Sequence, residues 1–561
     1  MKRSIRVLLP LFLITVLAGC NQKPKNMENE LRDFIKNYEA DVAPMMVDAF
    51  SSYWTASITG ADEDYAKYGE ANLKLTKYFT NKEYYQLLKK IKEEGNIQDT
   101  LLNRQLITLY NSFLSNQVDS VLLEKKINME MEVEKKYSNF RAIVNGKQLT
   151  DNDIEDILKT SVDSKELQSA WEAHKAIGTV VEKDVIELVK LRNEIAKQLG
   201  FDNYHSMSLQ LTEQNPEEIS ALFDELDELT RGSFVELKDE IDTFLSNRLN
   251  ITKDQLMPWH YQNRFFQEAP AIYSVELDKY YADKSIEKLT ADYYTSIGMD
   301  ISDIMGRSDL YEKPGKNQHA YCIDIDNSGD VRVLCNIKPN YNWMNTMMHE
   351  FGHAVYDKYI DRDLPFTLRN PAHTFTTEAI AMIFGRMAAN PYWMNDLGII
   401  SAEERDKIAM DAYKVLRLEQ LTFSRWAQVM YRFEKAMYEN PDQDLNKLWW
   451  DIVEKYQMIK KPEGRNEPDW ASKIHIATFP CYYHNYLLGE LLASQLNHYI
   501  TANIIKSDKF MNQSFYNNKQ VGDYLIKNVF GPGSHYEWND MIQRATGEKL
   551  TARYYADQFI N

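Results

Sequence analysis

The stretch His349-Glu350-Phe351-Gly352-His353 predicts both a helix and the chemistry of this chain. Residues four apart in an α-helix lie on the same face, so His349 and His353 can direct their imidazoles at one metal ion. Glu350 projects beside them, where it can act as a base toward water without being a ligand. Residues 342–360 carry apolar side chains at helical spacing, which is the setting that such a motif requires.

A zinc ion in a catalytic site takes three protein ligands and leaves one position for water. Glu378 is the candidate third ligand, because it lies near the start of a second predicted helix over residues 376–384. The intervening chain can finish the first helix, turn through Asp363-Leu364-Pro365 and return. The alternative is that Glu378 is only an acidic residue favoured by the dipole of its helix. The alternative for His349 and His353 is that they are ordinary packed or exposed residues. That alternative does not explain why Glu350 lies between them.

Residues 1–19 have the features of an export signal, with basic residues before an apolar run that is too short to span a bilayer. Leu17-Ala18-Gly19-Cys20 resembles a bacterial lipobox, in which the signal is removed and Cys20 receives lipid. We therefore expect a short tether over residues 20–40 and an exported protein anchored by its acyl chains to a bacterial membrane, periplasm-facing or outer. Simple secretion is the alternative, but it leaves Cys20 unexplained.

The formal net charge of −18 argues against contacts with nucleic acid or anionic membranes through the body of the protein. If Cys20 carries lipid, the remaining cysteines are Cys322, Cys335 and Cys481, which are too few for a disulfide-built scaffold. Cys322 and Cys335 flank a predicted hairpin, and a disulfide between them remains open. No obligate protein partner is inferred.

The fold class predicted is mainly α: one domain over residues 41–561, with two helical halves around a deep cleft. Prolines are absent between Pro44 and Pro216, and the apolar residues recur at helical spacing. The long helices expected in this half cover residues 29–92 with a break at Gly60, residues 99–137 after a break at Gly95, and residues 180–199 ended by Gly200.

Only residues 319–337 show a convincing strand pattern, which predicts a hairpin beside the cleft with its turn at Asn327-Ser328-Gly329. The aspartates of this turn resemble the start of a calcium loop. The twelfth position would be Cys335 instead of Glu, which favours a polar turn.

The chain resembles the angiotensin-converting-enzyme family of peptidyl dipeptidases over most of residues 40–550, most strongly over residues 319–495. The segments that carry the resemblance follow the histidine motif in the family's order: Asp363-Leu364-Pro365, Leu368-Arg369, Glu378-Ala379-Ile380, Trp449-Trp450, Lys455-Tyr456-Gln457, Arg465-Asn466-Glu467 and Lys473-Ile474-His475. The resemblance implies a zinc metallopeptidase with one Zn²⁺ per chain on His349, His353 and Glu378, and with Glu350 as the catalytic base.

The resemblance also implies roles for residues around the cut. A tetrahedral oxyanion needs a hydrogen-bond donor besides the metal, and Tyr486 with His475 fits that role. Tyr486 is aligned through Gln495, but the gap from His475 is one residue longer than in the family. Tyr483 and His484 therefore remain rivals.

The peptide would be held at its C-terminus and along its backbone. Lys473 and Tyr483 resemble the pair that holds its C-terminal carboxylate, with Gln262 as a loosely matched third member. His319 and Ala320 begin the strand that would pair with the peptide backbone.

Two family features are missing. Val453 and Asn485 stand where animal members have chloride-binding arginines, which argues against chloride dependence. Met382 replaces an Asp that lies near the metal, so another group must orient a zinc histidine.

The activity implied is zinc-dependent release of dipeptides from the C-terminus of short peptides. A zinc oligoendopeptidase or carboxypeptidase of the same helical superfamily is the alternative, as is a non-catalytic lipid-anchored binding protein.

Overall fold

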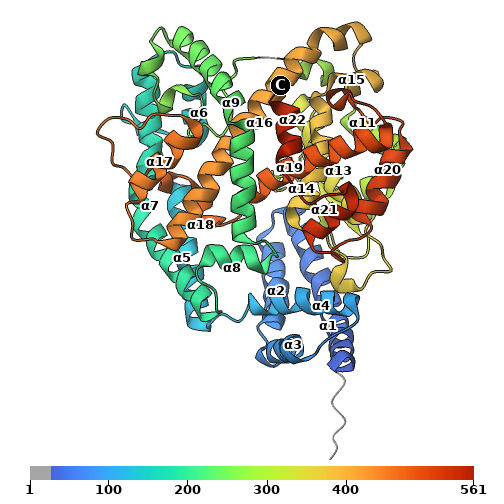
Figure 1. The fold of residues 1–561 in the computed structure, drawn as a ribbon. Helices are drawn as coiled ribbons and strands as arrows, with labels where there is room; N and C mark the ends of the chain where they lie inside the picture. Colours follow the sequence, from blue (N-terminus) through green and yellow to red (C-terminus); the bar gives the residue numbers. More distant parts are fainter. Residues whose placement is uncertain (1–26, 274, 561) are drawn as a thin grey trace, which may run out of the picture.

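The structure is a computed structural model that describes residues 27–273 and 275–560. Helices dominate the described residues, in which the strands form only two antiparallel pairs (Figure 1). The predicted mainly α fold is thus confirmed. The expected signal over residues 1–19 and the lipidation site Cys20 lie outside the described residues.

The N-terminal helices lie together at one end of the molecule (Figure 1). They are α1 (Met27–Thr59), α2 (Asp62–Phe79), α3 (Lys82–Glu94) and α4 (Thr100–Leu114). Three of them share a separate apolar core that includes Leu31 of α1, Leu88 of α3 and Leu106 of α4. Residues 27–40 therefore belong to a packed helix, which corrects the expected tether over residues 20–40.

The helices of this region are shorter than predicted because capping side chains interrupt them. The side chain of Asn81 accepts hydrogen bonds from the backbone N–H groups of Glu83 and Tyr84, so α3 begins anew after α2. Asp119 caps α5 in the same way, which separates α5 from α4. Short polar side chains that bond the backbone locally favour helix ends over helix interiors.

Two bodies of helices stand above this N-terminal layer (Figure 1). One contains α5 (Ser120–Asn139), α6 (Asp151–Thr160), α7 (Ser164–Gln198), α8 (Tyr204–Leu211), α9 (Pro216–Leu249), α17 (Leu445–Gln457) and α18 (Ile474–Thr478). The other contains α10 (Asp278–Tyr281), α11 (Ile286–Ser296), α12 (Ser302–Arg307), α13 (Tyr341–Lys358), α14 (Thr374–Gly385), α15 (Pro391–Asp396), α19 (His484–Tyr499), α20 (Lys519–Leu525), α21 (Trp538–Thr546) and α22 (Arg553–Phe559).

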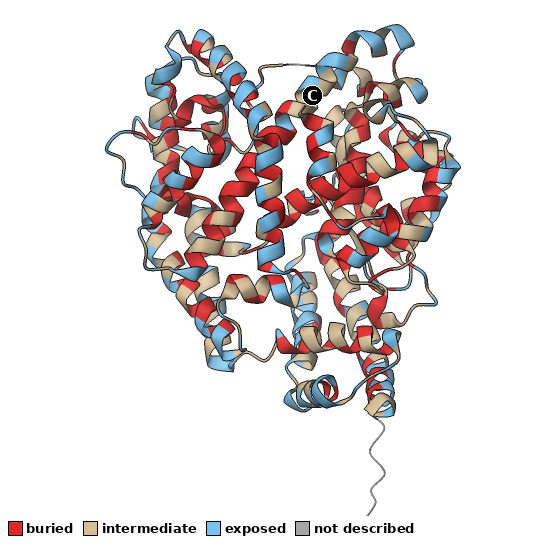
Figure 2. Ribbon diagram, viewed as in Figure 1, coloured by how far each residue is buried: buried red, intermediate tan, exposed pale blue. Residues whose placement is uncertain are grey.

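Helix α16 (Ala402–Glu439) joins the two bodies, because it contacts α7, α9 and α17 on one side and α15, α19 and α22 on the other. Buried residues predominate in α16 from Leu418 onward, where the helix lies between the two bodies (Figure 2). None of the helices in residues 27–273 and 275–560 has the length and apolarity needed to cross a membrane.

The predicted hairpin forms from β3 (Tyr321–Asp324) and β4 (Val331–Leu334). Its turn uses left-handed backbone at Asn327 and Gly329, and Asp326 accepts hydrogen bonds from the backbone of Ser328 and Asp330, as a polar turn does. Cys322, Cys335 and Cys481 are free thiols, so the disulfide considered above is not formed.

A second hairpin, β1 (Ala142–Val144) with β2 (Lys147–Leu149), was not predicted. Its signal is the pair Asn145-Gly146, which adopts the positive φ angles of a tight hairpin turn.

Candidate metal centre and active site

Helix α13 carries the histidine motif and begins at the cap Asn340, whose side chain accepts a hydrogen bond from the backbone of Trp343. Gly352 allows α13 to approach α14 closely, since a Cβ atom at Gly352 would lie 2.7 Å from Cα of Ala381. This close approach brings Glu378, on α14, to the two histidines of α13.

The three candidate ligands converge on one point. Nε2 of His349 lies 3.7 Å from Oε2 of Glu378, and Nε2 of His353 lies 3.9 Å from the same oxygen. All three ligand atoms lie within 4.8 Å of one another. Ligand atoms of a tetrahedral zinc ion, each about 2.1 Å from the metal, are about 3.4 Å apart. The donor set and its spacing thus fit zinc after a small contraction.

Burial shapes the charges of this group. It lowers the pKa of His349 to about 4, and burial together with His349 lowers the pKa of His353 to about 3, so both imidazoles are neutral and free to ligate. Burial raises the pKa of Glu378 to about 7, and burial together with the Glu378 charge raises that of Glu350 to about 8. The buried carboxylate of Glu350 and the half-buried carboxylate of Glu378 repel each other, which favours a bound cation between them.

Thr377 orients one of the histidines. Its Oγ1 lies 2.7 Å from Nδ1 of His353, leaving Nε2 directed at Glu378. A partner on the far nitrogen fixes both the ring orientation and the tautomer of a metal-binding histidine. The loss of an Asp at Met382 indicated that another group must orient a zinc histidine, and Thr377, which directly precedes Glu378, is such a group.

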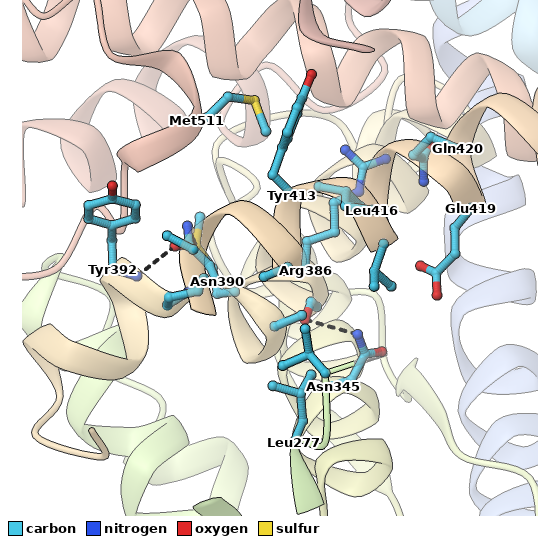
Figure 3. Close-up of a pocket in the computed structure, with 18 of the residues that line it drawn as sticks. Leu277, Asn345, Arg386, Asn390, Tyr392, Tyr413, Leu416, Glu419, Gln420 and Met511 are labelled. Carbon is cyan, nitrogen blue, oxygen red and sulfur yellow. Dashed lines mark hydrogen bonds between the residues drawn. The ribbon is translucent and has the colours of Figure 1, made fainter. Parts of the chain in front are cut away.

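The candidate metal centre lies between two hollows, both of which His349 lines. The first has a volume of about 590 Å³ and is bounded by Met46 and Phe50 of α1 and by Ala320 at the start of the hairpin. The second, of about 860 Å³, extends between α13, α14, α16 and α19 (Figure 3). Ala320 therefore lines the same hollow as the three candidate ligands, whereas His319 is exposed and lines neither hollow.

Lys473 lies buried at the start of α18. Its Nζ donates a hydrogen bond of 2.6 Å to Oε1 of Gln267 and lies over the rings of Phe265, Trp426 and Tyr483. Burial and the nearby Arg264 lower the pKa of Lys473 to about 7. Among the described residues it has no ion-pair partner.

The expected third member of this group, Gln262, is engaged elsewhere. Its side chain donates to the backbone carbonyl of Lys159 and accepts from the backbone N–H of Ala271. Gln267 takes its place beside Lys473. Local sequence offered no way to choose between the two, because the loop that holds them has no regular secondary structure.

Aromatic contacts connect Lys473 to the candidate metal centre. The ring of Tyr483 packs against His475 at 5.4 Å and against Tyr486 at 5.5 Å between centroids. Burial and, to a lesser extent, the charge of Glu378 raise the pKa of Tyr486, so its hydroxyl lies within electrostatic reach of that ligand. Burial and the Glu378 charge likewise raise the pKa of Tyr482, a neighbouring tyrosine that the sequence pattern did not single out.

His484 and Tyr483, the alternatives to Tyr486 as the oxyanion-binding residue, have other contacts. His484 is buried, and its Nε2 lies 2.7 Å from Oε1 of Gln214. Tyr483 contacts Lys473 instead. The structure therefore groups Tyr483 with the lysine and Tyr486 with Glu378.

The sequence profile of angiotensin-converting enzyme matches residues 25–238 and 265–556. The chain belongs to the angiotensin-converting enzyme family. The angiotensin-converting enzyme of Theromyzon tessulatum is 21% identical over 562 residues, which cover 94% of this chain and 90% of the relative. The enzyme of Mesocricetus auratus is 22% identical over 509 residues, covering 84% of this chain and 36% of that relative, so the chain spans about a third of its length.

This member of the angiotensin-converting enzyme family departs from the family pattern at positions that the structure explains. Thr377 supplies a histidine partner where Met382 cannot. Asn485, at a position of a family arginine, is buried and accepts a hydrogen bond from Gln214. Val453, at the other such position, is buried and apolar.

Proposed function

We propose that this protein is a zinc-dependent peptidase that releases dipeptides from the C-terminus of short peptides. One Zn²⁺ per chain would be held by His349, His353 and Glu378, the three side chains that converge in the structure. When bound there, zinc supplies a Lewis acid that activates water and polarises the peptide carbonyl.

Glu350 is the proton carrier of the proposal. It is buried beside the ligands, and its raised pKa of about 8 suits a group that must both accept and return a proton near neutral pH. Glu350 would accept a proton from the attacking water and deliver it to the departing amine. Tyr486, with His475 assisting, would donate a hydrogen bond to the oxyanion that forms on the carbonyl.

The proposed release of dipeptides is supported above all by the buried side chain of Lys473, which has no ion-pair partner among the described residues. A buried ammonium without a carboxylate partner is costly, so an anionic ligand is the expected complement. The C-terminal carboxylate of a peptide fits, with Lys473, Gln267 and Tyr483 around it. Ala320 would face the peptide backbone upstream of the scissile bond. The exposed residue His319 is less suited to that role.

The substrates proposed are short peptides, because Met46 and Phe50 of α1 border the hollow that contains the metal ligands. Chloride is not part of the proposal, since Val453 and Asn485 offer no positive charge to hold it.

Mass spectrometry of the products from a ten-residue peptide tests this function. Successive release of C-terminal pairs is expected, with severe slowing when the C-terminus is amidated. Single C-terminal residues would indicate a carboxypeptidase, and internal fragments that are insensitive to amidation would indicate an oligoendopeptidase. No cleavage by the zinc-loaded protein would leave the non-catalytic binding protein as the remaining function.

We also propose that the protein is exported and tethered to a bacterial membrane through lipid on Cys20, as the Leu17-Ala18-Gly19-Cys20 sequence suggests. Metabolic labelling with a radioactive fatty acid should mark the parent chain but not Cys20→Ala. Equal labelling of the two chains would contradict the tether.

A further inference from the structure

The segment of residues 479–483 joins α18 to α19 and passes from one helical body to the other (Figure 1). Cys481, in the middle of this segment, has a φ angle of 58°, which lies in the left-handed region. This conformation is unfavourable for a residue with a Cβ atom and persists only where the surrounding contacts fix it. The turn at Cys481 therefore depends on its neighbours.

Glu434 of α16 is the neighbour that holds this turn. Its Oε1 accepts a hydrogen bond of 2.9 Å from the backbone N–H of Cys481. Glu434 is 2% exposed and Cys481 is 6% exposed, so water cannot readily replace this acceptor. A buried backbone N–H that loses its partner destabilises the conformation in which it was bonded.

Stability alone does not explain a buried carboxylate at this position. Among the described residues, Glu434 forms no ion pair. Burying a carboxylate without such a partner is unfavourable, and local features of this kind are expected where function requires them. Either the carboxylate or the neutral acid can accept the Cys481 N–H, so the turn requires the acceptor oxygen and not the charge.

Arg192 of α7 fixes the chain directly before the turn. Its guanidinium donates a hydrogen bond of 2.6 Å to the backbone carbonyl of Ala477 and one of 3.2 Å to the hydroxyl of Tyr438. Tyr438 lies one turn after Glu434 on α16. Helices α7 and α16 thus hold the chain at two nearby points, Ala477 and Cys481.

The direction of the chain after Cys481 sets the position of Tyr483. Nζ of Lys473 lies 5.5 Å from the centroid of the Tyr483 ring, and the carbonyl of Tyr483 accepts a hydrogen bond of 3.3 Å from the backbone N–H of Tyr486. The gap from His475 to Tyr486 is one residue longer than in the family, and the turn at Cys481 lies within it. A change at this turn would therefore move Tyr483 relative to Lys473.

We infer that Glu434 is a positioning residue of the carboxylate-binding site: by accepting the Cys481 N–H, it keeps Tyr483 beside Lys473. The inference rests on the proposed function, in which Lys473 and Tyr483 bind the C-terminal carboxylate of the peptide. Glu434 itself would touch no substrate.

Kinetics with the zinc-loaded protein test this inference through the ratio of kcat/KM for a free-acid peptide to that for its amide. Glu434→Leu removes the acceptor and should lower this ratio roughly tenfold, as expected when a hydrogen bond to a charged group is lost, mainly through a higher KM for the free acid. Glu434→Gln retains an acceptor oxygen and should keep the parent ratio. A parent ratio in Glu434→Leu would overturn the inference.

Substitutions at Cys481 test the same hydrogen bond from its other end, whether or not Glu434→Leu folds. A β-branched residue disfavours positive φ, so Cys481→Val should lower the ratio as Glu434→Leu does. Glycine adopts positive φ freely, so Cys481→Gly should keep the parent ratio and should restore most of it when combined with Glu434→Leu. A parent ratio in Cys481→Val, or no restoration in the double variant, would show that the turn does not position Tyr483.

Gln428→Leu is the matched control for the loss of a buried polar group. Gln428 also lies on α16, is 1% exposed, and donates a hydrogen bond of 2.6 Å to the backbone carbonyl of Phe223 in α9. Its loss should lower the urea midpoint but leave the ratio as in the parent. An equal fall of the ratio in Gln428→Leu and Glu434→Leu would indicate a general loosening of α16 and would overturn the specific role of Glu434.

Calorimetry separates this inference from the proposed activity. The zinc-loaded Glu350→Gln protein should bind the dipeptide Ala-Phe more tightly than its amide, and adding Glu434→Leu should remove most of that difference. Equal Kd values in the Glu350→Gln protein would overturn the proposed carboxylate site and this inference with it. A difference that survives Glu434→Leu in full would overturn the role of Glu434 alone.

Discussion

Thr377 and His353 form a contact of 2.7 Å between a hydroxyl and an imidazole nitrogen, and the residue after Thr377 is the candidate ligand Glu378. One turn of α14 therefore supplies both a metal ligand and the group that orients another ligand. We expect Thr377→Val to weaken zinc binding by roughly tenfold to a hundredfold, the usual cost of losing such a partner.

A chelator competition that measures the zinc Kd would check this prediction. Thr377→Ser keeps the hydroxyl and should bind zinc nearly as the parent does. Thr374→Val, at an exposed threonine of the same helix, is the matched control. An unchanged Kd in Thr377→Val would show that the contact does not support the metal centre.

Zinc should stabilise the fold, because its three ligands come from two helices that otherwise carry repelling carboxylates. A ligand that binds only the native state at a hundred times its Kd stabilises that state by about 2.7 kcal/mol. The melting temperature of the chelator-stripped protein should rise when zinc is added back. His353→Ala should show little or no such rise, and a full rise in that variant would contradict the assigned ligands.

Glu350→Gln should lower kcat by roughly a hundredfold to ten-thousandfold, the range typical of general acid–base groups. The zinc content should be unchanged, since Glu350 is not a member of the ligand set. Steady-state kinetics with metal analysis on the same preparation would check both statements. Turnover at the parent rate would exclude Glu350 as the base.

The preference for a free C-terminus should depend on pH through Lys473, whose pKa is lowered to about 7. The ammonium that attracts a carboxylate is present below this pH and is lost above it. The ratio of kcat/KM for a free-acid peptide to that for its amide should therefore fall as the pH rises through about 7. Groups that act equally on both peptides change both kcat/KM values by the same factor when they ionise, so their effect divides out of this ratio.

Lys473→Arg provides the control, because arginine remains charged throughout this range. Its ratio should be nearly independent of pH, even if the altered geometry lowers the ratio. A parent ratio that is constant from pH 6 to pH 9 would show that Lys473 does not bind the carboxylate.

Gly352→Ala should destabilise the protein by about 1–3 kcal/mol, because the added methyl group would press on the backbone of Ala381 and separate α13 from α14. Zinc affinity should fall with it, since the two helices carry the ligands. Gly69→Ala, at an exposed helical position where nothing lies within 4 Å of the new Cβ, should instead be stabilising by about 0.5–1 kcal/mol. The urea unfolding midpoints of both variants would show whether the contact with Ala381 or the loss of glycine itself determines the change in stability.

Local patterns predicted those parts of the fold that local interactions determine. The spacing of apolar residues and the histidine motif predicted α13, and the strand alternation predicted the hairpin of β3 and β4. Caps at Asn81 and Asp119 divided helices that were expected to be continuous, although the side chains responsible are visible in the sequence. The second hairpin, with its turn at Asn145-Gly146, was missed for a similar reason.

By itself, the sequence determined a mainly helical chain and a candidate ligand set, because helical periodicity and the four-residue spacing of His349 and His353 act over a few residues. The tertiary structure alone decided which distant polar groups accompany them: Gln267 rather than Gln262 beside Lys473, and Thr377 behind His353. These pairings depend on how helices and loops from different parts of the chain pack together, and the spacing along a chain does not encode that packing.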